Sequence, residues 1–88
     1  MADLNALIRL HKHELDEKRR ALAAIYLELA ALEKERRDLE RAFEKEKEAA
    51  RLTENMHYTF AAYAESVRKR TAEIERKEAE VQDRKSVV

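Results

Sequence analysis

Residues 21–43 read ALAAIYLELAALEKERRDLERAF, and this stretch decides the fold. Its apolar residues recur at alternating intervals of three and four positions, as Leu22, Ile25, Leu29, Leu32, Leu39 and Phe43, with Arg36 in the same series. Because an α-helix turns once in about 3.6 residues, side chains at this spacing line one face. The stretch therefore predicts an amphipathic helix whose apolar seam packs on another helix.

The same heptad continues on both sides of this stretch. With position a at Ile8, the a positions are Ile8, Leu15, Leu22, Leu29, Arg36, Phe43 and Ala50, and the d positions are Leu4, His11, Lys18, Ile25, Leu32, Leu39 and Glu46. Ten of these fourteen residues are apolar, which indicates a sustained seam. Lys18 and Arg36 leave two interpretations open: they set the register or the choice of partner, or their long stems extend past the seam into water.

The seam weakens over residues 44–55, which read EKEKEAARLTEN. Thr53 and Asn55 favour a helix end, because their side chains bond to the local backbone and Asn tolerates the left-handed conformation. A second stripe follows, made of Met56, Phe60, Tyr63, Val67, Ile74, Val81 and Val88. Placing Phe60 and its heptad equivalents at a rather than at d gives Met56 and Tyr63 as d residues. This change of register indicates a break near residues 52–56.

Two all-α architectures fit these stripes. We favour an antiparallel two-helix coiled-coil hairpin, a single domain over residues 1–88, with helix one at about 3–52, a turn at about 53–56 and helix two at about 57–86. The alternative is one continuous long helix in a coiled-coil oligomer. In the hairpin, residues 4–18 extend beyond helix two and leave Leu4, Leu7, Ile8 and Leu15 free for a partner.

Composition agrees with a helical rod. The chain has no Gly, Pro or Cys, and Ala, Glu, Lys, Leu and Arg fill 59 of its 88 positions. Its 19 basic and 19 acidic residues cancel, which argues against a nucleic-acid partner because a phosphate backbone requires a basic stripe. Its apolar runs are too short to cross a bilayer, so we expect a soluble chain.

Few residues suggest chemistry. His11 shares a helix face with Glu14, and His13 shares one with Glu17, but each pair supplies only two ligands, so we expect no metal site. Acidic residues have cations four positions on, as in Glu73–Lys77 and Glu80–Arg84. A rod offers no pocket to shift their pKa values, so we expect neither an enzyme nor a cofactor.

Three aromatic residues open the second stripe: Tyr58, Phe60 and Tyr63. One interpretation is that they fill the tip of the hairpin. The other is a recognition patch, since aromatic residues are enriched at interface hot spots.

The whole pattern resembles the FliJ family of flagellar type III export chaperones. The opening LNALIRLHKHELDEKRRALAAIY looks like that family's N-terminal arm, and EKEKEAARLTEN like its polar middle. FAAYAESVRKRTAEIERKEAEV is similar to the F/Y-x-x-Y/F-x-x-x-V/L opening of the family's second helix. The chain departs from the family in length, because family members usually have a much longer second helix.

This resemblance implies a chaperone or stalk at the cytoplasmic face of the inner membrane, coupling a hexameric export ATPase to the membrane export gate. Exported substrates or their chaperones are further implied partners. The ATPase-facing stretch would be residues 10–20, with Leu10, Leu15, Lys18, Arg19 and Arg20. The gate-facing surface would start with Tyr63, Val67 and Arg70, beside Phe60. A monomeric hairpin and a homodimer both remain open, and the alternative function is a generic coiled-coil scaffold or spacer.

Overall fold

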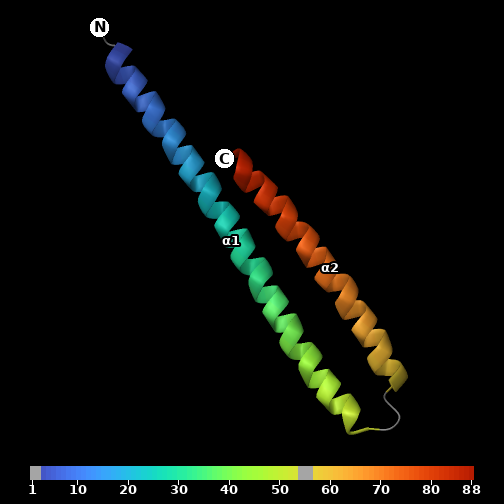
Figure 1. Ribbon diagram of the computed structural model, residues 1–88. Coiled ribbons are helices and arrows are strands. Elements are labelled where there is room, and N and C mark those ends of the chain that lie inside the picture. The colour runs from blue at the N-terminus through green and yellow to red at the C-terminus, as the bar shows by residue number, and fades with distance from the viewer. Residues whose placement is uncertain (1–2, 54–56) are drawn as a thin grey trace.

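Two antiparallel α-helices lie side by side in the computed structural model, which describes residues 3–53 and 57–88 (Figure 1). Helix α1 spans Asp3–Arg51 and helix α2 spans His57–Val87. The predicted hairpin is confirmed, with helix ends within one residue of those expected. Asn55 and Met56, which we predicted for the turn and for the second stripe, lie outside the described residues.

The end of α1 follows from local hydrogen bonding. The backbone amides of Leu52 and Thr53 donate to the carbonyl oxygens of Ala49 and Ala50, at 3.2 and 3.4 Å. The Thr53 hydroxyl also donates to the Ala49 carbonyl oxygen, at 3.2 Å. These bonds use carbonyl groups that have no partner further along the helix. Thr53 therefore bonds locally to the backbone at the helix end, as its side chain predicts.

The core is a narrow seam between the helices. Ile74 is fully buried, and Val81 and Ile25 are 4% and 6% exposed. The α1 side of the seam is otherwise half-buried, with Glu35 half-buried beside it, and consists of Leu22, Leu29, Leu32, Arg36, Leu39, Phe43 and Ala50. These are the predicted a and d residues from Leu22 onward, except Glu46, which is exposed. The heptad therefore identified the buried face of α1 correctly.

The α2 side of the seam has half-buried rows on both flanks of Phe60, Val67, Ile74 and Val81. One row is Tyr63, Arg70 and Lys77, and the other is Ala64, Thr71, Glu78 and Lys85. The Glu78 side chain is 26% exposed, whereas those of Lys77 and Arg84 are 41% and 58% exposed. The second row, which continues the α1 heptad, is thus buried at least as deeply as the first row. The predicted change of register is therefore not needed to describe the seam.

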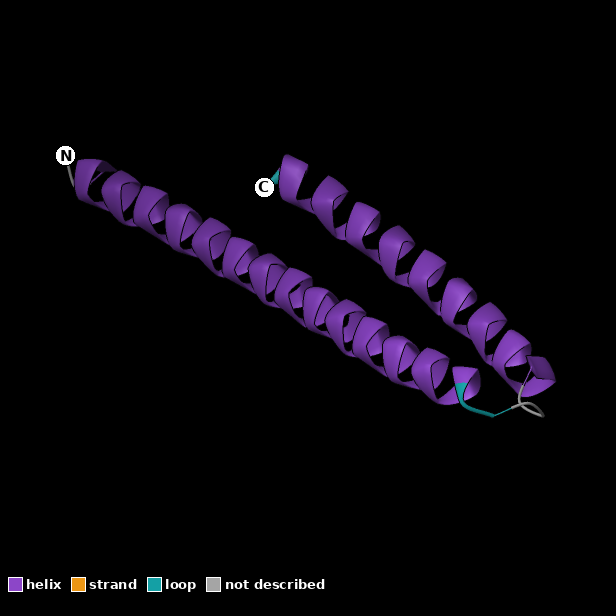
Figure 2. Cartoon of the chain, turned by 60° about the horizontal axis from the view of Figure 1, so that its bottom comes forward, coloured by secondary structure: helices purple, strands orange, loops and turns teal. Residues whose placement is uncertain are grey.

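The molecule is a rod with one unpaired end (Figure 2). It measures 82 × 17 × 12 Å, and its radius of gyration is 22.2 Å, against about 12 Å for a compact chain of this length. Residues 3–20 of α1, here called the N-terminal overhang, project past the end of α2 (Figure 1). Over residues 3–53 and 57–88, neither helix has a stretch both long and apolar enough to span a lipid bilayer.

Candidate docking surface

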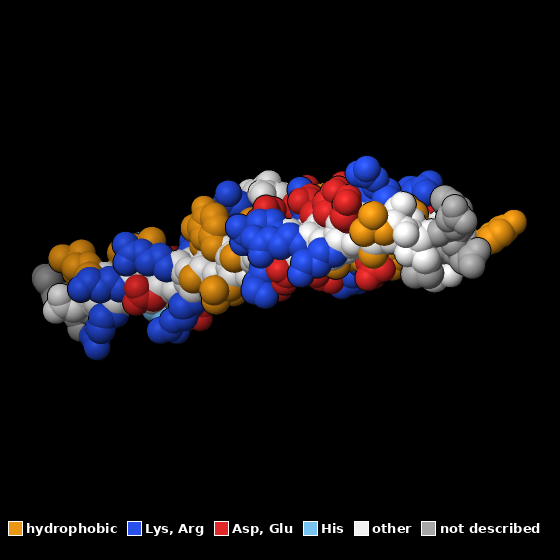
Figure 3. All heavy atoms as spheres, turned by 90° about the horizontal axis from the view of Figure 1, so that it is seen from below, with side chains coloured by type: hydrophobic (Ala, Val, Ile, Leu, Met, Phe, Trp, Pro, Cys, Tyr) orange, Lys and Arg blue, Asp and Glu red, His pale blue; other side chains and the backbone are white. Residues whose placement is uncertain are grey.

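The N-terminal overhang carries an apolar stripe with nothing packed on it among the described residues. Leu4, Leu7, Ile8 and Leu15, here called the overhang stripe, are between 47% and 67% exposed. Leu4, Ile8 and Leu15 occupy the a and d positions of the heptad that α2 covers further along α1. In Figure 3 apolar side chains gather at this end of the rod, with Lys and Arg side chains between them. The overhang stripe is therefore a direct continuation of the hairpin seam.

Polar contacts support the overhang as a helix despite the missing partner. His13 Nε2 lies 3.0 Å from Glu17 Oε1, and Arg19 Nη1 lies 3.9 Å from Asp16 Oδ1. Each such pair three or four residues apart stabilises an exposed helix by about 0.3 kcal/mol. By helical periodicity His13, Asp16 and Glu17 lie away from the overhang stripe, whereas Arg19 flanks it beside Leu15.

The predicted ATPase-facing residues are all exposed, but they do not share one face. Leu15 lies on the overhang stripe, and Lys18 follows on the same line. Leu10 is 51% exposed and lies to one side of it. Arg19 is four residues from Leu15 and flanks the same face, whereas Arg20 lies on the opposite face of the helix. Lys18 and Arg19 therefore lie beside the apolar part of the predicted stretch, whereas Arg20 faces away from it.

The predicted gate-facing residues are largely used by the hairpin itself. The Phe43 ring lies 5.7 Å from that of Phe60 and 6.3 Å from that of Tyr63, between ring centroids. Val67 is half-buried and lines a shallow hollow together with Phe43. These contacts favour the interpretation in which the aromatic residues fill the tip of the hairpin. Only Tyr58, at 92% exposed, stands clear of the seam.

Arg70 ties α2 to α1. Its Nε donates to Glu35 Oε1 at 2.7 Å, and its Nη1 donates to Glu73 Oε2 at 2.8 Å. The hydrogen bonds that Arg70 donates to Glu35 and then to Glu73 raise the pKa of Arg70 above its ordinary value. The hydrogen bond from Arg70 in turn lowers the pKa of Glu73. Arg70 therefore has a structural role between the helices, with 38% of its side chain still exposed.

Further contacts between the helices were missed by the sequence analysis. Arg36 Nη2 lies 2.5 Å from Glu78 Oε1, and Lys85 Nζ lies 5.0 Å from the centre of the Tyr26 ring. Arg84 reaches Glu28 at 2.5 Å rather than the predicted Glu80, whereas the predicted Glu73–Lys77 pair is present at 3.8 Å. No sequence pattern reveals such pairs until the alignment of the two helices is known.

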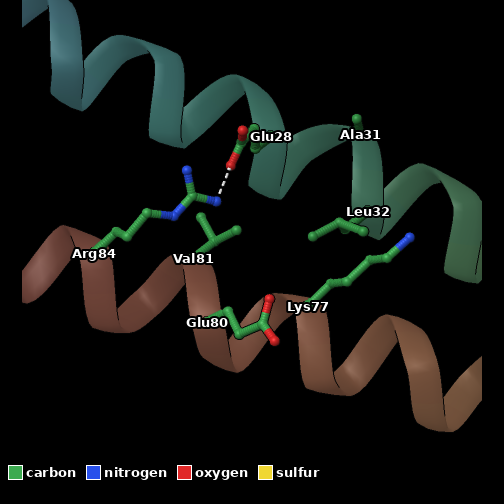
Figure 4. A pocket seen from close by; sticks show the side chains of 7 residues that line it. All are labelled: Glu28, Ala31, Leu32, Lys77, Glu80, Val81 and Arg84. Carbon is green, nitrogen blue, oxygen red and sulfur yellow. Dashed lines mark hydrogen bonds and ion pairs between the residues drawn. The ribbon is translucent and has the colours of Figure 1, made fainter.

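The hollows along the seam are open grooves. Figure 4 shows one of about 290 Å³, where Leu32 and Val81 lie between the helices and Arg84 bonds Glu28 at the rim. Its lining residues are Glu28, Ala31, Leu32, Lys77, Glu80, Val81 and Arg84, which include no His, Ser or Cys.

Metal-ligand groups are sparse in the described part of the chain. His11 Nδ1 lies 3.7 Å from Glu14 Oε2, and His13 pairs with Glu17, so each histidine has one carboxylate beside it. No group of three or more His, Cys, Asp or Glu residues that could hold a metal ion occurs within residues 3–53 and 57–88. The overhang stripe is thus the candidate functional surface of this rod.

Comparison with known proteins returned no match to a protein-family model, to a curated protein or to a solved structure.

Proposed function

We propose that this chain is a coiled-coil chaperone or stalk of the flagellar type III export apparatus, working at the cytoplasmic face of the inner membrane. The observation that carries the proposal is a two-helix antiparallel rod with an unpaired, apolar-striped end. A two-helix antiparallel coiled coil is what the resemblance to the FliJ family implies, and the apolar pattern of the chain itself predicts the uncovered stripe. In this role the chain binds the export ATPase ring at one end and contacts the export gate along α2.

The rod transmits movement because ion pairs and apolar packing hold its two helices together along their paired length. Cross-helix pairs such as Arg36–Glu78 and Arg84–Glu28 oppose sliding of α2 along α1. The overhang stripe supplies apolar area for insertion into a groove of the ATPase, as amphipathic helices do. The gate contact uses the exposed edges of Tyr63, Val67 and Arg70, which the seam covers only in part.

Binding to the cognate export ATPase tests this proposal. The full chain should be retained by the immobilised ATPase, and Leu15→Glu should weaken binding by at least ten-fold, about 1.4 kcal/mol, by placing a charge in an apolar contact. The matched control is Leu27→Glu, because Leu27 is 73% exposed and lies on α1 beyond the overhang. Absence of binding by the unsubstituted chain, or equal losses in the two variants, would refute the proposed contact.

A second candidate is a structural spacer, favoured by the 82 Å length of the rod and its balanced charge. A spacer requires length and stiffness but no particular residue on the overhang stripe. The two functions therefore differ in the outcome of Leu15→Glu in cells: a stalk loses export, whereas a spacer keeps its function.

A further inference from the structure

We infer that the N-terminal overhang is also a self-association element, through which two copies of this chain pair antiparallel and end to end. The overhang stripe continues the established seam of the hairpin, and α2 stops at Val87, over Ala24 and Ile25. The overhang of a second copy has the right chemistry for the uncovered part. It is a helix of equal length that carries the same a and d residues, and a two-fold axis closes the contact.

The heptad fixes how the two overhangs align. In an antiparallel pair the a residues of one helix face the d residues of the other. Leu4 of one copy then faces Leu15 of the second copy, and Ile8 faces His11 of the second copy. The two-fold axis repeats both contacts, so the interface has four layers, and two of them consist of leucine alone. Leu7 flanks this line and adds apolar area at its edge.

Charged residues favour this alignment over the one that is shifted by one heptad. A shift of one heptad toward α2 would place Lys18 opposite Ile8 of the second copy. It would also bring Glu14 beside Glu14 of the second copy, and Lys12 beside Lys12 of the second copy. Like charges facing each other are unfavourable. The shifted helix would also overlap the end of α2, which occupies the space over Ala24 and Ile25. In the proposed alignment Lys18 lies between the second copy's overhang and α2, where its ammonium stays in water.

The proposed dimer is weak because its interface is small. Only about two heptads pair in each copy, and short helices gain little from so few layers. His11 interrupts an otherwise apolar line and weakens two of the four layers. Self-association therefore rises with concentration, and it covers the same surface that the proposed ATPase contact uses. The two partners exclude each other, so the dimer protects the overhang stripe while no other partner is bound.

Sedimentation equilibrium of the full chain, up to ~1 mM, tests the pairing. We expect the mean mass to rise with concentration from monomer toward dimer. Ile8→Glu should abolish this rise in mean mass. Leu10→Glu introduces the same charge beside the overhang stripe and should leave the rise in mean mass unchanged. His11→Leu should tighten the dimer at least ten-fold, and His13→Leu, which alters the opposite face, should have no such effect. A chain that stays monomeric at every concentration overturns the inference. So does equal self-association of Ile8→Glu and Leu10→Glu, or of His11→Leu and His13→Leu.

Cysteine cross-linking tests the alignment directly, because the chain has no cysteine of its own. Chains carrying Ile8→Cys are mixed with chains carrying His11→Cys and oxidised. The antiparallel alignment places positions 8 and 11 within disulfide reach, so the mixed dimer should dominate. A parallel pair would instead join Ile8→Cys chains to each other. Predominance of those homodimers would refute the antiparallel contact.

Discussion

Arg36 shows how one polar residue is accommodated in a narrow seam. It occupies an a position between Leu32 and Leu39, and the structure pairs it with Glu78, with 31% and 26% of the two side chains exposed. Its Nε is buried without a hydrogen-bond partner among the described residues. The partner on the other helix favours the interpretation in which Arg36 sets the register of the hairpin.

Single and double substitutions at this pair should behave differently. Arg36→Leu and Glu78→Leu should each destabilise the hairpin by about 1–2 kcal/mol, because each leaves a partly buried charge alone. The double substitution should recover most of that loss, since two leucines pack in the seam. Urea denaturation of the four proteins measures the effect. Additive losses in the double variant would show that the two side chains are not coupled.

Ile74 is the most buried side chain in the described part of the molecule. Ile74→Ala should lower the free energy of unfolding by about 2–4 kcal/mol, because it removes buried methyl groups and leaves a cavity. Leu27→Ala serves as the control, since Leu27 is 73% exposed and its truncation should change stability by less than ~0.5 kcal/mol. Similar losses in thermal denaturation of the two variants would contradict the position of the core.

Glu73 should make stability depend on pH. Arg70 lowers the pKa of Glu73 in the folded chain below its ordinary 4.5, so near that pH the unfolded chain binds more protons. The stabilisation is present above pH 4.5 and is lost as the pH falls through the folded pKa. Glu73→Gln should therefore lower the melting temperature at pH 7, and the difference should vanish in acid.

The control for this pH effect is Glu75→Gln. Glu75 is exposed and forms no ion pair with any residue that the structure describes. Its substitution should leave the melting temperature nearly unchanged at both pH values. A difference between Glu73→Gln and the parent chain that persists at pH 3 would rule out the Arg70 contact as its cause.

At the scale of the element, α1 consists of two parts that differ in what stabilises them. From Leu22 onward its apolar face is covered by α2, whereas the N-terminal overhang depends on helix propensity and exposed ion pairs. Most helical stability in proteins comes from packing of the apolar face, so the overhang should open more often than the paired part.

Hydrogen exchange should separate these two parts of α1. In dilute solution the amides of residues 7–18 should exchange at least about ten-fold faster than those of residues 25–43, because local opening of the overhang breaks no contact with α2. Exchange followed by mass spectrometry or NMR measures the contrast. Uniform protection along α1 in a dilute monomer would mean that the overhang has a partner within its own chain.

At the scale of the whole molecule, a rod and a dimer of rods differ in length. Small-angle scattering of a dilute solution should give a radius of gyration near 22.2 Å and a longest dimension near 82 Å. At high concentration the longest dimension should approach roughly 140 Å, because two rods of 82 Å overlap only through overhangs of ~27 Å, at ~1.5 Å rise per residue. A side-by-side dimer would keep the shorter length and would contradict the proposed contact.

The helices, the buried face of α1 and the overhang stripe all follow from the amino-acid sequence alone. These features depend on local propensity and on the spacing of Leu22, Ile25, Leu29 and their equivalents, which is a property of one chain segment. The overhang stripe was predictable for the same reason, because Leu4, Ile8 and Leu15 follow the same heptad as the paired part of α1.

The alignment of the two helices, and with it the choice of polar residues that meet, became known only from the folded arrangement. The pairs Arg36–Glu78, Arg70–Glu35 and Arg84–Glu28 join residues far apart in the chain, and many alternative pairings carry complementary charge. The folded arrangement also decided that Phe60 and Tyr63 pack on Phe43. The physical reason is that the heptad specifies a face of each helix, while the alignment along that face follows from the summed contacts of both helices.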